Sequence, residues 1–172
     1  MEELIDELNE AGSKIGTITK DEAHAKGILH RVVHVWIIND KNQILVQKRA
    51  SLKDFYPNVW DVSFAGHVKA GESSLEAVLR EGKEELGIDV DENDLEYAFT
   101  FLDKLYYKDI VSNEFADVYV LRKNIDISNL KLQSEELAQV MWLPLSRFFV
   151  LCYSNKFLPH IEGYKRLKDY LS

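Results

Sequence analysis

The sequence predicts an α/β (α+β) fold in which one central mixed β-sheet lies between α-helices. Short β-branched and aromatic runs predict strands, one amphipathic segment near the middle predicts a helix, and two more helical segments follow near the C-terminus. Strands that alternate with helices and are then followed by helices typically form a sheet covered on both faces. A length of 172 residues suits one domain, so residues 1–172 are expected to form a single domain.

The strands are placed by β-branched and aromatic runs. Residues 31–38 read RVVHVWII, which is too short for a helix that is apolar all round and predicts a strand buried on both faces. A turn cluster at 39–42 leads to a second strand at 43–49. The other expected strands are 60–64, 96–102, 114–121 and 138–143, and an N-terminal hairpin is expected over residues 1–20, around Asn9 to Gly12.

The clearest helix is expected over 73–86. Ser73 and Glu76 form a capping box at its start, and Gly87 stands where a left-handed C-terminal cap belongs. One face of this helix is apolar and is marked by Leu75, Val78, Leu79 and Leu86. C-terminal helices are expected at about 145–171, as two segments, 145–153 and 161–171.

Composition and charge exclude several classes of protein. The net charge of −8 opposes a protein that grips nucleic-acid phosphates, so no nucleic-acid polymer is expected as a partner. The N-terminus reads MEELIDE, unlike a signal peptide, and no apolar run approaches the length of a membrane span. The single cysteine, Cys152, lies in an apolar run and cannot form an internal disulfide. We therefore expect a cytoplasmic protein with no membrane contact, and leave a homodimer open.

The expected helix carries three glutamates opposite its apolar face. Glu81, Glu84 and Glu85 are spaced i, i+3 and i+4, so their side chains project side by side. Carboxylates this close repel one another, and the arrangement becomes favourable when a hard cation such as Mg²⁺ lies among the oxygens. The alternative is a solvated acidic helix face, which is the commoner role of charge runs.

The glutamates belong to a longer pattern over residues 66–88. Five residues separate Gly66 from Glu72, and seven more precede Arg80-Glu81-x-x-Glu84-Glu85-x-Gly87-Ile88. This pattern resembles the Nudix box, G-x5-E-x7-R-E-U-x-E-E-x-G-U, where U is apolar. Seven fixed residues, each used at roughly 5–7%, would coincide about once in 10⁸ starts. Gly82 departs from the pattern at the first apolar position, and we expect close packing of helix on sheet to explain it.

The resemblance implies a Nudix fold and a hydrolase that directs water onto a small-molecule diphosphate, usually a nucleoside diphosphate linked to another moiety. It implies Mg²⁺ or Mn²⁺ held by Glu81, Glu84 and Glu85, with the backbone of Gly66 close by. Such a metal neutralises the diphosphate and lowers the pKa of the attacking water. The matching residues Arg80 and Glu72 would hold the glutamates by charge-assisted hydrogen bonds.

The general base and any further metal ligand stay open. Glu81 and Glu84 are candidates for the base, as is a residue outside the box. Glu114, at the start of an expected strand, is the candidate extra metal ligand. Glu135 and Glu136 are further options, although exposed loop acids without a ligand are more common.

A second resemblance covers roughly residues 1–145 and points to isopentenyl diphosphate isomerase and its hydrolase relatives. The isomerases carry a catalytic cysteine immediately before a Gly-His pair, and Ala65 occupies that position here. They also typically lack the first glutamates of the R-E-U-x-E-E core, which this chain keeps. The resemblance is carried by Gly27 to Ile38, Leu45 to Ala50, Tyr56 to Trp60, and Ala65 to His67.

The same resemblance implies a second metal site. In the isomerases, histidines that match His24, His30 and His67 bind a metal together with two glutamates near Glu114, but Ser112 replaces one of those glutamates. The alternative is that strand histidines such as His30 are hydrogen-bonded core residues.

Three residues are candidates for substrate binding. Arg49 and Lys53 match phosphate-contacting positions of the isomerases, and an arginine at a strand end can bind phosphate bidentately. His67, next to Gly66, is the third candidate for substrate binding, with Arg49 and Lys53. A solvated strand end is the alternative for Arg49 and Lys53. We expect a Nudix hydrolase, with isopentenyl diphosphate isomerase and a catalytically silent nucleotide-binding Nudix domain as the alternatives.

Overall fold

A computed structural model describes residues 2–172; Met1, which the expected hairpin and domain include, lies outside the described residues. The strands are β1 (Leu4–Leu8), β2 (Lys14–Thr19), β3 (His30–Ile38), β4 (Gln43–Arg49), β5 (Trp60–Asp61), β6 (Phe64–His67), β7 (Leu95–Tyr107), β8 (Ile110–Arg122) and β9 (Leu137–Pro144). The helices are α1 (Lys20–Lys26), α2 (Ser74–Glu81), α3 (Leu145–Leu151) and α4 (Ile161–Leu171). Three short segments complete the chain: a π-helical turn, η1 (Gly82–Leu86), and 3₁₀ turns η2 (Glu92–Asp94) and η3 (Ile127–Asn129).

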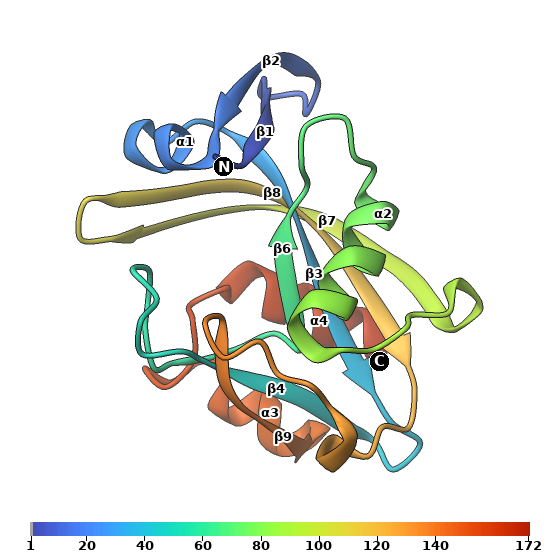
Figure 1. The fold of residues 1–172 in the computed structure, drawn as a ribbon. Helices are drawn as coiled ribbons and strands as arrows, with labels where there is room; N and C mark the ends of the chain where they lie inside the picture. The colour runs from blue at the N-terminus through green and yellow to red at the C-terminus, as the bar shows by residue number, and fades with distance from the viewer. Residues whose placement is uncertain (1) are drawn as a thin grey trace.

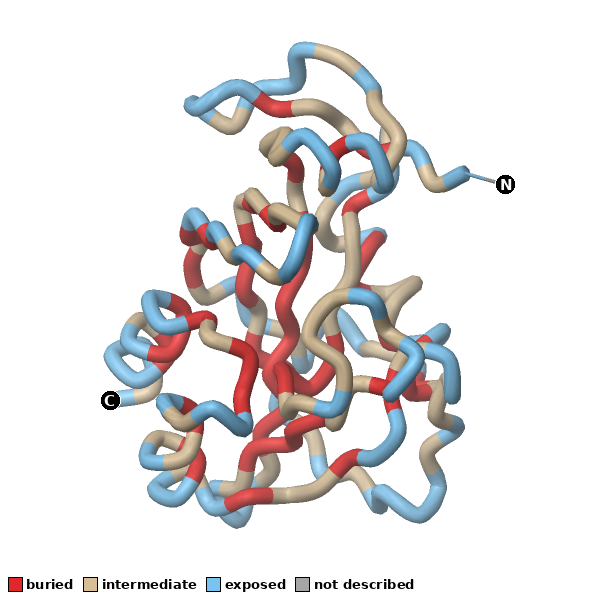
Figure 2. The backbone as a smooth tube through the Cα atoms, turned by 90° about the vertical axis from the view of Figure 1, so that its left-hand side faces the viewer, coloured by how far each residue is buried: buried red, intermediate tan, exposed pale blue. Residues whose placement is uncertain are grey.

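Strand β3 is the centre of a seven-stranded mixed sheet (Figure 1). The strand order is β5-β4-β3-β8-β7, with β6 also paired to β3 and β9 to β4. The β3–β8 pair is parallel, whereas β4 and β6 run antiparallel to β3. The predicted mixed central sheet is therefore confirmed, and Figure 2 shows its middle strands as the main buried part of the chain.

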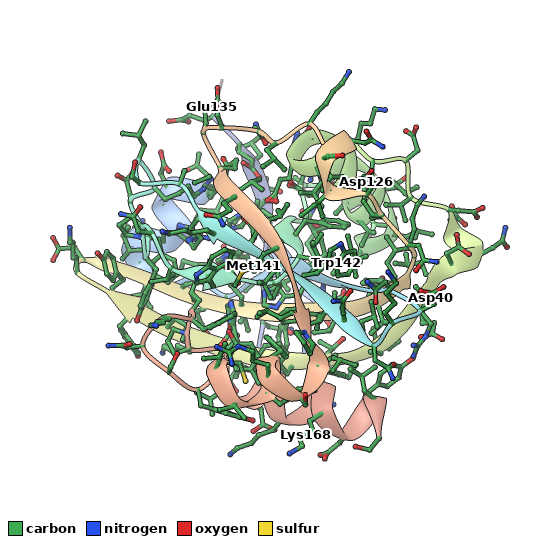
Figure 3. The ribbon with its side chains drawn as sticks, turned by 90° about the horizontal axis from the view of Figure 1, so that it is seen from below. Asp40, Asp126, Glu135, Met141, Trp142 and Lys168 are labelled. Carbon is green, nitrogen blue, oxygen red and sulfur yellow. The ribbon has the colours of Figure 1, made fainter. Side chains whose placement is uncertain are left out.

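Two cores cover the two faces of this sheet because successive side chains of a strand point to opposite faces. Val33, Val35 and Ile37 pack in a core with the helix formed by α2 and η1. Trp36 and Ile38 pack in the other core, against α3 and α4. On β9, the neighbours Met141 and Trp142 contact the α3–α4 core and the α2 core, respectively (Figure 3). The expected sheet between helices is thus observed.

Strands β3 and β4 diverge, and this divergence makes room for a site. Their only register pair is Ile38 with Ile44. Beyond it, β6 pairs with β3 and β5 pairs with β4. Ser63, fully buried between β5 and β6, accepts a hydrogen bond from the Ile37 amide at 2.8 Å and donates one to the Leu45 carbonyl at 2.5 Å. Ser63 therefore links the two strands where they separate.

Several expected boundaries were wrong. The single strand expected over 60–64 is two short strands, because β5 and β6 pair with different partners on either side of Ser63. Helix α1 was not predicted; it has only seven residues, and it is bounded by the Thr19 side-chain cap and by Gly27 at φ 68°. The β7–β8 hairpin extends beyond the expected strands at 96–102 and 114–121. Among residues 2–172, no helix has both the length and the apolar character needed to cross a bilayer.

Candidate active site

The helix expected over 73–86 is present, but its winding changes where the glutamates lie. The capping box at Ser73 begins α2, as expected. The α-helix ends at Glu81, and Gly82–Leu86 continue as a π-helical turn closed by Gly87. Short π-helical turns of this kind occur frequently at functional sites. Glu81 is therefore the last residue of α2, whereas Glu84 and Glu85 lie in the π-helical turn.

Gly82 lies in a closely packed position. A Cβ atom at this position would lie 3.0 Å from Val90 Cγ2 and 3.3 Å from Phe64 Cζ. Both neighbours are apolar side chains packed between helix and sheet. The expected explanation for the departure from the Nudix pattern is therefore confirmed.

Arg80 connects the acidic residues of the box. Its Nε and Nη2 atoms donate to the two oxygens of Glu72 at 2.8 and 2.9 Å. Its Nη1 atom donates to Glu81 at 2.7 Å and to Glu84 at 3.3 Å, and Nη2 also donates to the His67 carbonyl at 2.9 Å. Burial alone would raise the pKa of Glu72, but the Arg80 hydrogen bond lowers it. The structure thus brings Arg80, Glu72, Glu81 and Glu84 together.

Glu81 lies directly on the backbone of Gly66. A Cβ atom at Gly66 would be only 2.1 Å from Glu81 Oε1, so any other residue would displace this carboxylate. Burial raises the pKa of Glu81 to about 7, although Arg80 opposes the shift and Glu84 adds to it. A carboxyl group with a pKa near neutrality is suited to accepting a proton.

Glu85 is the most buried of the three, with only 5% of its surface exposed. Within residues 2–172, its carboxylate receives one hydrogen bond, from the Ala65 amide at 3.4 Å. Burial, and then repulsion from Glu81, raises its pKa well above the usual range. Glu84, in contrast, is exposed, and the described oxygens of the three glutamates are not gathered within 4.8 Å. A buried carboxylate with one long hydrogen bond fits a site for a cation, because isolated buried charge is costly.

A second cluster joins four elements: His24 on α1, His30 on β3, His67 on β6 and Glu114 on β8. One ligand atom from each lies within 4.8 Å of all the others. His30 Nδ1 lies 2.8 Å from the Ile28 carbonyl, which fixes the proton on Nδ1 and leaves Nε2 facing Glu114 Oε1 at 3.4 Å. His67 Nε2 lies 3.3 Å from His24 Nε2 and 3.8 Å from Glu114.

The electrostatics of this histidine cluster suit a metal. Burial lowers the pKa of His24 to about 4 and that of His67 well below its usual value, so both rings are neutral at pH 7. Burial alone would raise the pKa of Glu114, but the neighbouring His30 ring, whose Nε2 lies 3.4 Å from Glu114 Oε1, lowers it. His30 Nε2 is buried and makes no hydrogen bond within residues 2–172. Burial alone would lower the pKa of His30, but Glu114 raises it, so a metal at Nε2 would compete with a proton there. Imidazole nitrogens with a carboxylate are a donor set for transition metals, and this set fits one.

Arg49 is already engaged within the protein. Its Nε atom donates to the carbonyls of Phe55 and Tyr56 at 3.1 Å, and its Nη2 atom donates to Phe55 at 2.8 Å. Its Nη1 atom donates to Asp61 at 3.2 Å. These contacts hold the loop between β4 and β5, so Arg49 has few donors left for a phosphate.

Lys53 forms an ion pair with Glu136 at the rim of the cavity described next. Glu135 is exposed and lies at the edge of the molecule in Figure 3. Glu114, the expected extra ligand, belongs to the histidine cluster and contacts His30 and His67.

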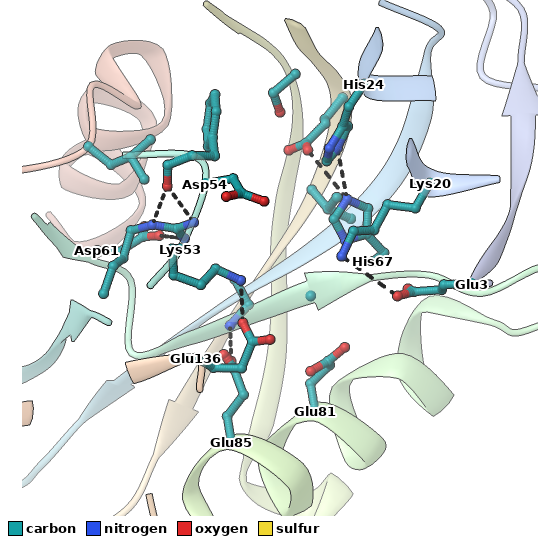
Figure 4. A pocket seen from close by; sticks show the side chains of 18 of the residues that line it. Glu3, Lys20, His24, Lys53, Asp54, Asp61, His67, Glu81, Glu85 and Glu136 are labelled. Carbon is teal, nitrogen blue, oxygen red and sulfur yellow. Dashed lines mark hydrogen bonds and ion pairs between the residues drawn. The ribbon is translucent and has the colours of Figure 1, made fainter. Parts of the chain in front are cut away.

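The box glutamates and the histidine cluster open into one cavity of about 850 Å³. In Figure 4, Glu81 and Glu85 rise from the helix, His24 and His67 lie across from them, and Asp61 and Lys53 line the other side. This volume lies within the range of sites for small organic ligands. Lys53 and Arg49 also line it.

A third cluster, which no sequence pattern predicted, lies at the end of the cavity near α4. His160 Nδ1 lies 2.5 Å from Asp103 Oδ2, and His160 Nε2 lies 3.0 Å from Asp61 Oδ1, with all three residues buried. Burial alone would lower the pKa of His160, but Asp103 and Asp61 raise it to about 10. The ring of His34 lies 4.7 Å from that of His160. The available signal was Asp103, an acidic residue that follows the apolar run Phe101–Leu102 of the strand.

The register also brings Asp103 directly opposite Glu114 on β7 and β8. Like charges opposite one another destabilise a sheet. Each carboxylate here has its own histidine, His160 for Asp103 and His30 for Glu114. The third cluster and the histidine cluster therefore stand on adjacent strands.

The family model described as the NUDIX domain matches residues 28–162. The chain belongs to the Nudix hydrolase family. A Nudix hydrolase of Listeria innocua is 38% identical over 158 residues, which cover 92% of this chain and 88% of the relative. Nudix hydrolase 3 of Arabidopsis thaliana is 38% identical over 153 residues, but the chain spans only 20% of that longer protein.

This Nudix chain is also similar to isopentenyl-diphosphate Delta-isomerase of Shigella boydii, with 34% identity over 140 residues that cover 81% of the chain and 75% of the isomerase. Among solved structures, DR0079 from Deinococcus radiodurans has a TM-score of 0.77 at 24% identity, over 95% of this chain and 98% of that one. These similarities confirm the Nudix fold and the predicted kinship with the isomerases.

One difference from the isomerases is clear in the structure. Ala65 stands on β6 beside the cavity, and Cys152 is fully buried in the α3–α4 core. Burial raises the pKa of the Cys152 thiol to about 11. The single cysteine of this Nudix chain therefore does not replace the one expected before the Gly-His pair.

Proposed function

We propose that this chain hydrolyses the diphosphate of a small molecule, a nucleoside diphosphate linked to another moiety, with Mg²⁺ or Mn²⁺ as cofactor. The observation that carries the proposal is the buried, weakly partnered carboxylate of Glu85 beside Glu81 on Gly66, in a cavity large enough for such a substrate. The intact glutamates of the box argue against a catalytically silent domain.

Each box residue has a proposed role. Glu81, Glu84 and Glu85 hold the cation, and Gly66 leaves room for it and for Glu81. Arg80 and Glu72 position the glutamates through the hydrogen bonds described above. When bound, the metal neutralises the diphosphate and activates water. Glu81, which lies against Gly66, is also the proposed acceptor of the proton from water.

Three further residues are proposed to contact the substrate: Arg49 and Lys53, outside the box, and His67, next to Gly66. Lys53 must leave Glu136 to reach a phosphate, and Arg49 can use only the N–H groups not directed at the loop. His67 is also a member of the histidine cluster, so it would lie between the substrate and that cluster.

The proposal is tested with the full chain and a panel of diphosphate compounds, with and without Mg²⁺ or Mn²⁺. ADP-ribose is a suitable first probe, because the NUDIX domain of Shewanella oneidensis NrtR, a structural neighbour with a TM-score of 0.61, was solved with ADP ribose. We expect metal-dependent release of phosphate products from at least one nucleoside diphosphate derivative. Conversion of isopentenyl diphosphate to its dimethylallyl isomer, with no hydrolysis of any compound, would instead support the isomerase.

We further propose that His24, His30, His67 and Glu114 bind a transition metal. Metal-free protein is expected to take up one Co²⁺ at this cluster and to show the visible absorption of a nitrogen-rich site. His30→Ala should remove that absorption, whereas Glu92→Gln, on an exposed turn, should keep it. Equal Co²⁺ spectra for wild type and His30→Ala would show that the cluster does not bind the metal.

A further inference from the structure

One part of the cavity is not used by the chemistry proposed above. We call it the polar corner, and it consists of His34, Gln47, Asp61 and His160, all of which line the cavity. His34 is 4% exposed and Gln47 is 3% exposed. Neither side chain makes a hydrogen bond with any of residues 2–172, so the polar atoms of both remain available to a molecule in the cavity.

The fold makes these four residues contiguous. The register of β4 and β5 pairs Gln47 with Asp61, so their side chains lie on the same side of that ladder. Asp61 accepts from His160 at 3.0 Å, and the His160 ring lies 4.7 Å from the His34 ring. The polar corner therefore runs from Gln47 on β4 and Asp61 on β5, through His160 at the start of α4, to His34 on β3.

Two of the four residues are fixed and two are free to bind. Both ring nitrogens of His160 are engaged by carboxylates, and Asp61 is also held by Arg49 and by the Val62 amide. His34 offers one donor and one acceptor when neutral, and Gln47 offers an amide with two donors and one acceptor oxygen. The polar corner thus presents free donors and acceptors on a rigid support.

The polar corner begins beside the proposed reaction centre. Ala65 is the register partner of His34 on β6, and its amide donates to Glu85 at 3.4 Å. A group attached directly to a diphosphate held at Glu85 is therefore within reach of His34. In this chain, the part of the cavity next to Ala65 is lined by the polar side chains of His34 and Gln47.

We propose that the polar corner binds a hydroxyl-bearing ring, such as a sugar, attached to the diphosphate, and selects it over a hydrocarbon group. A hydroxyl both donates and accepts, as His34 and Gln47 do. A hydrocarbon group would displace water from His34 and Gln47 without replacing the hydrogen bonds that this water makes. Sites built to hydrogen-bond a substrate hydroxyl strongly reject analogues that lack the hydroxyl. This inference rests on the proposed hydrolysis of a diphosphate.

The test compares ADP-glucose with ADP cyclohexyl ester, whose six-membered ring lacks the hydroxyls, the hydroxymethyl group and the ring oxygen of glucose. With Mg²⁺, wild-type protein is expected to have a kcat/KM at least about 100-fold higher for ADP-glucose. His34→Leu and Gln47→Leu should each reduce this ratio at least about tenfold. Gln139→Leu, on the exposed side of β9, is the matched control and should keep it.

Calorimetric Kd values for the same two compounds separate failure of the inference from failure of the proposed function. If neither compound nor any other diphosphate is hydrolysed, the proposed function is wrong, and the polar corner is judged by the ratio of Kd values. If the wild-type protein binds the two compounds with a ratio of Kd values near one, the inference is overturned and no variant is needed. A large ratio that neither His34→Leu nor Gln47→Leu changes also overturns it.

Discussion

Glu85→Gln is expected to lower kcat for diphosphate hydrolysis by about 10²–10³-fold, a loss typical of removing one electrostatic group from a reaction centre. The change keeps the size of the side chain but removes the charge that the proposed cation requires. Because Glu85 is buried with one long hydrogen bond, neutralising it should not lower the stability of the metal-free protein. Steady-state kinetics and thermal unfolding of the same samples measure both effects.

The metal dependence of unfolding gives a second readout for this prediction. Mg²⁺ that binds only the folded wild-type protein should raise its Tm, and Glu85→Gln should reduce this rise. Glu92→Gln, on the exposed turn η2, is the control and should retain both the Tm rise and the rate. Wild-type rates in both Glu84→Gln and Glu85→Gln would contradict the assignment of the metal ligands.

His160→Gln is expected to destabilise the protein by about 3–5 kcal/mol near pH 6, the usual cost of breaking a buried ion pair. The variant leaves Asp61 and Asp103 buried without their cationic partner. The free energy of unfolding, measured by chemical denaturation of wild type and variant at each pH, gives this difference.

The same destabilisation should depend on pH with a definite sign. The pKa of His160 is raised from about 6.5 in the unfolded chain to about 10 in the folded protein. The stabilisation is therefore complete below pH 6.5 and is lost progressively as the pH rises toward 10. Asp103→Asn, which removes one of the two carboxylates, should show a similar trend. If the difference in the free energy of unfolding between wild type and His160→Gln stays constant from pH 6 to 10, this account is wrong.

Local patterns predicted the parts of the fold that depend on local interactions. The capping box at Ser73 and the buried run of β3 were predicted correctly, because capping and side-chain alternation act over a few residues. The spacing of the Nudix box likewise identified the residues that Arg80 connects. The π-helical turn at Gly82–Leu86 was not predicted, and neither was the close packing of its first residue, Gly82, against Phe64 and Val90.

The polar corner could not be predicted for a different reason. Within the polar corner, His160 is 99 residues from Asp61 along the chain. Asp103, which holds the other nitrogen of His160, is 57 residues away. No local spacing links them; they meet because α4 returns to the open side of the sheet. Arg49 illustrates the same limit, since its strand-end position indicated a phosphate contact, whereas the folded chain directs most of its donors to a loop.

The opposed carboxylates Asp103 and Glu114 have a consequence for both clusters that they serve. They occupy a single rung of the β7–β8 ladder, so the charge on one contributes directly to the electric field at the other. A dication that neutralises Glu114 among the histidines relieves repulsion on Asp103, and loss of the proton on His160 increases it. Occupancy at one end of the cavity and protonation at the other are thereby thermodynamically linked.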